Sequence, residues 1–259
     1  MLERLERAGF DILTKNHARA ILTHDFRDEL AGLVEALAGF RIDVAEILSG
    51  GGGEAVFTQR LRRDLSERGW PKHVFNVQTV VDGVEREAIS HEIDHVKQTA
   101  NGTLALEIEW NNKDPFYDRD LENFQRLHVL SAVSVGVIVT RGASLQSSFR
   151  RRIAARLRSD GIADEDGLTR YGIDERTVAQ RRAVARAVAS GASFVEAFTR
   201  NFVASKFGQA TTHWTKLEAR VARGVGNPCP LLLIGLPASV LTDEPQSETA
   251  AADLFGRQR

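Results

Sequence analysis

Residues 88–110 read AISHEIDHVKQTANGTLALEIEW, and this stretch decides the fold expected for the chain. Two segments rich in β-forming residues are separated by Thr99-Ala100-Asn101-Gly102, which is typical of a turn. The stretch is therefore expected to form a β-hairpin. Because residues i and i+2 of a strand share a face, Glu107 and Glu109 should point the same way. Asp94 can then approach them across the hairpin.

Three carboxylates that converge repel one another unless a cation lies between them. Oxygen ligands favour hard ions such as Mg2+, which can polarise a phosphodiester and activate a water molecule. The alternative is an exposed polar strand face, since acidic residues are common. Two features favour a site. Apolar Ile93 and Val96 place Asp94 at the margin of the core, and residues 110–120 are dense in the amides, Lys and Arg that contact bases and phosphates.

A second pattern overlaps the first, because His91-Glu92-Ile93-Asp94-His95 matches the zinc-protease motif H-E-x-x-H. That chemistry requires a helix, on which both histidines lie one turn apart and the glutamate acts as general base. The segment here has the pattern of a strand, and no third ligand is evident downstream. A zinc protease is kept as the weaker alternative.

The segments around the hairpin predict an α/β fold, with a mixed sheet that has helices on both sides. Two almost continuous apolar runs, residues 132–139 and 230–237, are typical of strands buried on both faces. Helical periodicity is found in residues 24–39, 54–68, 117–131 and 211–224. Residues 148–207 are expected to be a helical elaboration within a single domain, residues 1–259, whose polar tail frays from about residue 242.

Composition narrows the class of protein without fixing it. The chain of 259 residues has one cysteine and neither a signal-like nor a membrane-length apolar run, so a soluble protein of a reducing cytoplasm is expected. The net charge of −1 hides an asymmetry. Residues 141–223 hold 16 basic and 8 acidic side chains, and the rest hold 18 and 27. One basic face for a polyanion would explain this, and so would an ordinary solvated helix surface.

The hairpin and the helix after it resemble the BglII/BamHI group of type II restriction endonucleases, of the PD-(D/E)xK nuclease superfamily. The resemblance is carried by Ile93-Asp94, by residues 106–114 (LEIEWNNKD) and by Asp118-Arg119-Asp120-Leu121 with Phe124. It covers roughly residues 24–140 and 208–240, and leaves residues 148–207 unmatched.

The resemblance implies a magnesium site. Asp94 and Glu107 would be the metal ligands, and the Ile108 carbonyl would complete the site. Glu109 stands where most of the superfamily has lysine, but the BamHI type also has glutamate at this position. The general base is therefore either Glu109 or a metal-bound water activated in another way. Glu54, which follows a four-glycine loop at the start of a helix, would assist.

The resemblance also implies a homodimer that cuts both strands of a palindromic site in double-stranded DNA, leaving 5′-phosphate ends. A cognate DNA methyltransferase and a bacterial cytoplasm are expected with it. A DNA-binding module of the same fold with a decayed site is the alternative. The residues expected at the DNA are Asn111, Asn112, Lys113, Arg119, Lys206, Gln209, Thr212 and His213.

Overall fold

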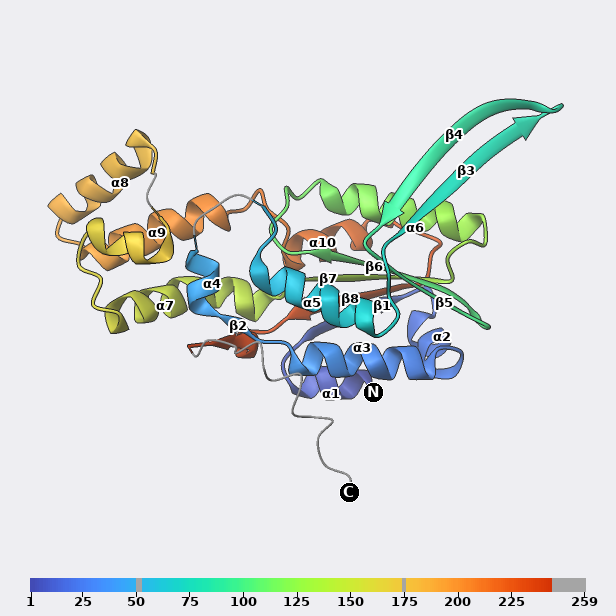
Figure 1. Ribbon diagram of the computed structural model, residues 1–259, viewed down its shortest axis with the longest axis horizontal. Helices are drawn as coiled ribbons and strands as arrows, with labels where there is room; N and C mark the ends of the chain where they lie inside the picture. Colours follow the sequence, from blue (N-terminus) through green and yellow to red (C-terminus); the bar gives the residue numbers. More distant parts are fainter. Residues whose placement is uncertain (50–52, 174–175, 244–259) are drawn as a thin grey trace, which may run out of the picture.

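A computed structural model describes residues 1–49, 53–173 and 176–243 of the chain (Figure 1). Its centre is a five-stranded mixed sheet in the order β1-β8-β7-β6-β5. Strands β6, β7 and β8 are parallel, whereas β5 and β1 are antiparallel edge strands. The strands are β1 Asp11–Lys15, β5 His95–Thr99, β6 Gly102–Glu109, β7 Val135–Arg141 and β8 Leu231–Leu236. The α/β fold with a mixed sheet is confirmed, and the two apolar runs are its central strands.

The hairpin expected over residues 88–110 is shorter than predicted. Antiparallel pairing with β6 begins at His95, and Asp94 lies at a bend. The preceding strand, β4 (Val84–Ile93), pairs instead with β3 (His73–Val81) in a two-stranded ribbon that projects from the body (Figure 1). The alternating pattern runs through both pairings, so it does not reveal the bend, which the Val96 N–H stabilises by donating to the Pro71 carbonyl at 2.8 Å.

Helices cover both faces of the sheet, because the side chains of each central strand alternate between two apolar clusters. Leu106 and Val137 pack into the cluster that holds the N-terminal helices, while Ala105 and Ile138 pack into the other. The first cluster contains α1 (Leu2–Arg7), α2 (Ala18–His24), α3 (Arg27–Gly39), α4 (Val44–Leu48) and α5 (Val56–Glu67). The second contains α6 (Phe116–Val129) and α10 (Trp214–Ala222).

Some segments differ from the sequence-based expectation. The helix predicted for residues 24–39 is α3, which begins three residues later than expected, and the preceding helix α2 was not predicted. The edge strand β1 and helix α1 were not predicted. A short parallel pair joins β2 (Ile42–Asp43) to β9 (Leu241–Thr242), which follows a 3-10 helix, Ala238–Val240. The predicted frayed tail falls almost entirely in residues 244–259, outside the described part of the chain.

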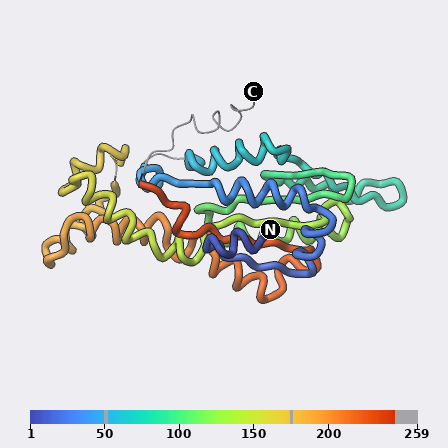
Figure 2. Tube along the Cα trace, turned by 90° about the horizontal axis from the view of Figure 1, so that it is seen from below, coloured from blue at the N-terminus to red at the C-terminus, as the bar shows by residue number. Residues whose placement is uncertain are grey.

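The helical elaboration is confirmed as a lobe that extends from one end of the sheet (Figures 1 and 2). Its interior residues, such as Phe149 and Phe198, belong to the same apolar cluster as the N-terminal helices. The lobe consists of α7 (Ala143–Ser159), a 3-10 helix (Asp166–Tyr171), α8 (Val178–Ala189) and α9 (Phe194–Lys206). Across the described residues, no helix is both long and apolar enough to cross a membrane.

Candidate active site

Strand β6 carries two acidic side chains on one face, as the sequence predicted. Glu107 and Glu109 alternate with Leu106 and Ile108, which pack on the opposite face. The two carboxyl groups therefore point toward α6, and their residues are only 4% and 2% exposed. Carboxylates are rarely buried so deeply unless charge or hydrogen bonds compensate them.

Helix α6 adds a third buried carboxyl group, which the sequence analysis did not count as part of the site. Asp120 is 0% exposed, and its Oδ1 accepts hydrogen bonds from Arg119 at 2.9 and 2.7 Å. Its Oδ2 is buried without a hydrogen-bond partner among the described residues. Helical spacing could have revealed it, because Asp120 falls on the same face as the apolar Leu121 and Phe124.

The three carboxyl groups shift one another's protonation. Burial, followed by the negative charge of Asp120, raises the pKa of Glu107 to about 10. The same two causes raise the pKa of Glu109 to about 9, and burial also raises the pKa of Asp120. Such a cluster favours bound protons or a bound cation, since either removes the repulsion between like charges. The donor set therefore fits a hard divalent ion.

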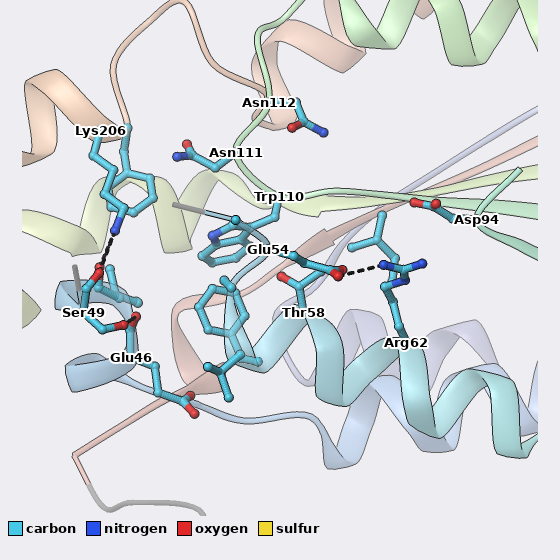
Figure 3. A pocket seen from close by; sticks show the side chains of 17 residues that line it. Glu46, Ser49, Glu54, Thr58, Arg62, Asp94, Trp110, Asn111, Asn112 and Lys206 are labelled. Atoms are coloured by element: carbon cyan, nitrogen blue, oxygen red, sulfur yellow. Dashed lines mark hydrogen bonds and ion pairs between the residues drawn. The ribbon is translucent and has the colours of Figure 1, made fainter. Parts of the chain in front are cut away.

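Asp94 lies next to Glu107. Its backbone N–H donates to Glu107 Oε2 at 3.3 Å, and its half-buried side chain faces a cleft of about 620 Å3 (Figure 3). Glu109 has other partners, because Asn112 Nδ2 donates to its Oε2 at 2.9 Å and Arg119 Nη2 lies 3.8 Å from its Oε1. The expected triad is thus divided into an Asp94–Glu107 pair and a Glu109 group.

No three His, Cys, Asp or Glu side chains of the described residues already converge in a geometry that would hold a metal. Mg2+ does not require such a cage, because it is commonly bound by one or two carboxylates together with waters and substrate phosphates. Asp94 and Glu107 can supply the two carboxylates. Ile108, expected to offer its carbonyl, lines the same cleft as Asp94.

Glu54 also lines the cleft, just before α5 begins, and pairs with Arg62 at 2.7 Å (Figure 3). Three of the glycines before it, residues 50–52, lie outside the described residues. Glu54 and Asp94 thus face the same cleft from two different elements, and the assisting role of Glu54 stays a prediction.

The residues after β6 are held by a ladder to the segment that follows the lobe. The Thr212 N–H donates to the Asn112 carbonyl at 2.9 Å, and the Asn112 N–H donates to Thr212 Oγ1 at 3.1 Å. Lys113 forms a bridge with Thr211. Asn111 lines the cleft, and its buried Oδ1 has no hydrogen-bond partner among the described residues. This oxygen is therefore an unsatisfied acceptor in the wall of the cleft.

Two residues expected at the DNA are buried instead. Thr212 is 0% exposed and His213 is 5% exposed, so neither side chain offers a surface, and that of Thr212 supports the ladder instead. Burial, followed by the positive charge of Arg141, lowers the pKa of His213. The difference arises because α10 begins at Trp214 and packs against the sheet, which turns the preceding residues inward.

The other expected DNA contacts are spread around the cleft. Lys206 lines it, but its ammonium donates to the Ile47 carbonyl at 3.0 Å and to the Ser49 carbonyl at 3.4 Å (Figure 3). Arg119 is exposed, although it pairs with Asp120. Gln209 is exposed and lines a separate cavity beside the lobe.

Arg141, the last residue of β7, is a further residue that the sequence analysis missed. It is fully buried, and burial lowers its pKa to about 10. Its guanidinium donates to Thr211 Oγ1 at 2.7 Å, to the Thr212 carbonyl and to Gln146 Oε1 at 2.6 Å. Its position at the end of an apolar strand could have indicated that this arginine is buried and holds neighbouring segments together.

The overlapping zinc-protease motif lacks the helix that its chemistry requires. His91 lies in β4, His95 lies in β5, and the bend at Asp94 separates them. Glu92 is exposed and pairs with Lys72 at 2.6 Å. His95 Nδ1 bonds the Trp70 carbonyl at 3.0 Å, and burial lowers its pKa. The protease alternative therefore fails on secondary structure.

Comparison with known proteins agrees with the geometry. A protein-family model described as restriction endonuclease BglII/BglIII matches residues 10–236. The match runs from the residue before β1 to the end of β8, so it includes the acidic strand and the lobe. No sequence among the curated proteins matches the chain significantly.

Proposed function

Because the chain belongs to the BglII/BglIII family of restriction endonucleases, we propose that it cuts both strands of a palindromic DNA site by Mg2+-dependent hydrolysis, leaving 5′-phosphate ends. The family makes it a type II site-specific deoxyribonuclease. The observation that carries the finer proposal is the Asp94–Glu107 pair, a half-buried and a buried acid in contact at the edge of a cleft.

In this proposal, Asp94, Glu107 and the Ile108 carbonyl hold the ion. When bound, Mg2+ would polarise the scissile phosphate and lower the pKa of a water molecule. Glu109 is the proposed proton acceptor in its ionised form, which a cation bound beside it would favour over the protonated form that burial favours in the metal-free chain. The Asn112 amide fixes its Oε2 at 2.9 Å. The alternative for this step, a metal-bound water activated without Glu109, predicts that Glu109→Gln retains substantial cleavage. Glu54 would assist from the α5 side of the cleft, oriented by Arg62.

The proposed DNA-contacting surface is the mouth of the cleft. Asn111, Asn112 and Lys113 would contact bases or phosphates there, since amides and cations serve both roles. Arg119, exposed beside the acidic cluster, would contact a phosphate. Gln209 is exposed and lines a separate cavity beside the lobe, where it would contact the DNA backbone. Lys206 and Thr212, which were expected to bind DNA, would act by holding the cleft and its loop in place, and the buried His213 is given no DNA contact.

The biological setting follows from the same family. A palindrome is best read by two copies related by a twofold axis, so a homodimer is proposed. A DNA methyltransferase of the same specificity would protect the host, and the bacterial cytoplasm would be the compartment. Sedimentation with and without duplex DNA would test the dimer directly.

The central experiment is digestion of phage DNA with Mg2+, followed by sequencing of the fragment ends. Discrete ends at one repeated palindrome, carrying 5′-phosphates, are expected. Asp94→Asn and Glu107→Ala should abolish cleavage, whereas the exposed Glu122→Gln on α6 should cut normally. Wild-type cleavage by either acidic-site variant would refute the proposed site. Binding that resists EDTA, with no cleavage of any substrate, would point to the inactive DNA-binding module.

A further inference from the structure

We propose that the helical lobe binds the phosphates of duplex DNA that flanks the recognition site. This inference rests on DNA being the substrate but not on the proposed chemistry. It is carried by a set of exposed arginines, called here the arginine face, none of which forms an ion pair within the described part of the chain. The arginine face comprises Arg150, Arg151, Arg181, Arg182, Arg186 and Arg200.

Other arginines of the lobe have structural partners. Arg156 pairs with Asp160 at 2.7 Å and with Asp43 at 3.1 Å, and the buried Arg176 pairs with Glu165 at 3.2 Å. Nearby acidic side chains of the lobe are therefore used by other arginines and do not neutralise the arginine face. Exposed cations without partners bind phosphates with little desolvation cost, and each contact gains from counterion release.

The arginine face continues the proposed DNA surface. The hydrogen bonds that hold Asn112 continue to the residue after Gln209, since the Asp114 N–H donates to the Ala210 carbonyl at 3.0 Å. Gln209 and Arg150 line one cavity of about 500 Å3, together with Ala204 of α9. Arg200 lies one helical turn before Ala204, so it is on the same face of α9.

The second group of arginines lies on α8, which packs against α9. Gln180 Nε2 donates to Ser205 Oγ at 3.1 Å, which fixes the start of α8 beside the end of α9. Arg181 and Arg182 follow directly and are exposed, whereas Val184 is buried. The exposed side of α8 thus carries Arg181, Arg182 and Arg186 between the exposed Val178 and Val188 near its two ends.

The lobe is held at a fixed position relative to the cleft. The ring of Phe149 on α7 lies 6.3 Å from that of Trp110, the residue after β6, and 4.5 Å from that of Phe207. Gln146 Nε2 donates to the Phe207 carbonyl at 2.8 Å. A preorganised basic surface loses little entropy on binding, so its contacts add affinity efficiently.

The length of the lobe indicates how much flanking DNA it can reach. Helix α7 has 17 residues and leads from the body into the lobe (Figure 1). It is about 25 Å long at ~1.5 Å per residue, which corresponds to roughly seven base pairs. The ribbon lies at the other end of the molecule (Figures 1 and 2) and holds Asp82, Glu85 and Glu87 against Arg86, while its Glu92 pairs with Lys72. Its charge repels DNA, so the extension should be on the lobe side of each chain.

The test compares two duplexes that contain the same site, read from the sequenced digestion ends, with flanks of about 3 or about 12 base pairs. Binding is measured by fluorescence anisotropy in EDTA over a series of salt concentrations. The variant is Arg150→Gln/Arg181→Gln/Arg182→Gln/Arg200→Gln. The control is Arg4→Gln/Arg7→Gln, two exposed arginines on α1, across the sheet from α6 (Figure 1).

Wild type should bind the longer duplex at least about tenfold more tightly. The fourfold variant should lose this advantage, with a salt slope lower by about 3 to 4 for each bound subunit, which is about 7 for the proposed dimer, and should keep its affinity for the shorter duplex. Equal length dependence in variant and wild type would overturn the proposal. If the fourfold variant is unfolded, Arg181→Gln/Arg182→Gln should give about half the slope change. If no cleavage is found and the site stays unknown, binding to random-sequence duplexes of the same two lengths is measured instead, so the test does not depend on the chemistry.

Discussion

Replacing Glu107 by Gln should abolish cleavage and yet stabilise the metal-free protein at neutral and alkaline pH. The carboxyl is 4% exposed, and burial, with the charges of Asp120 and Asp94, raises its pKa from 4.5 to about 10. Between these two values, the folded chain keeps a proton that the unfolded chain releases. The stability contributed by this group is therefore complete below about pH 4.5 and falls as the pH rises toward 10.

The loss of stability at a given pH depends on how far that pH lies above 4.5, the pKa of the unfolded chain. At pH 7 about 2.5 pH units have been crossed, which at ~1.4 kcal/mol per unit amounts to roughly 3 kcal/mol. Glutamine has nearly the same shape and carries no charge at any pH, so it avoids this loss. For a chain of this size, 3 kcal/mol corresponds to a shift of about 6–12 °C in the unfolding midpoint.

The assay is thermal unfolding followed by circular dichroism in EDTA, at pH 5 and pH 8. Wild type should melt at a lower temperature at pH 8, and Glu107→Gln should lose less stability between the two pH values. Added Mg2+ should raise the midpoint of wild type at pH 8 but not that of the variant. Glu122→Gln, an exposed change on α6, serves as the control. A variant less stable than wild type at pH 8 would refute the reasoning.

Three further outcomes are expected. Thr212→Val removes the hydroxyl that accepts the Asn112 N–H at 3.1 Å, so it should cost about 1–3 kcal/mol in chemical denaturation and reduce cleavage more than the stability loss explains. Gly136→Ala would place a methyl group 2.7 Å from Phe124 Cγ, and such overpacking should lower stability by about 1–3 kcal/mol or more in the same assay. Cys229 is fully buried and its pKa is raised to about 12, so Ellman's reagent should label it only after unfolding; rapid labelling of the native chain would contradict this.

The sequence predicts the central sheet well, because strands buried on both faces leave continuous apolar runs. Strand β8 (LLLIGL) and most of β7 were found in this way. Strand β1 (DILTK) was missed because it is a half-buried edge strand with no uniform pattern. The bend at Asp94 was missed for a different reason. Alternation describes which residues point inward, and it does not say which strand each one pairs with.

The site was predictable to the extent that it follows strand periodicity. Glu107 and Glu109 share a face as expected, but the depth of their burial depends on α6, which approaches from elsewhere in the chain. Asp120 could have been predicted as part of the site only by working out which face of α6 it lies on. Thr212 needed the ladder to residue 112, a contact between segments 100 residues apart that no local pattern encodes.

Arg141 shows why the lobe and the acidic strand have to be considered together. Its guanidinium bonds Gln146 at the start of the lobe and Thr211 at its exit. The residue after Thr211 holds the backbone of Asn112, and the Asn112 amide in turn donates to Glu109. A continuous set of hydrogen bonds thus joins the base of the lobe to the proposed proton acceptor. Removing the lobe would leave a buried guanidinium with fewer partners and would free the loop that orients Glu109. The lobe is therefore a structural support of the proposed active site as well as the proposed carrier of flanking DNA contacts.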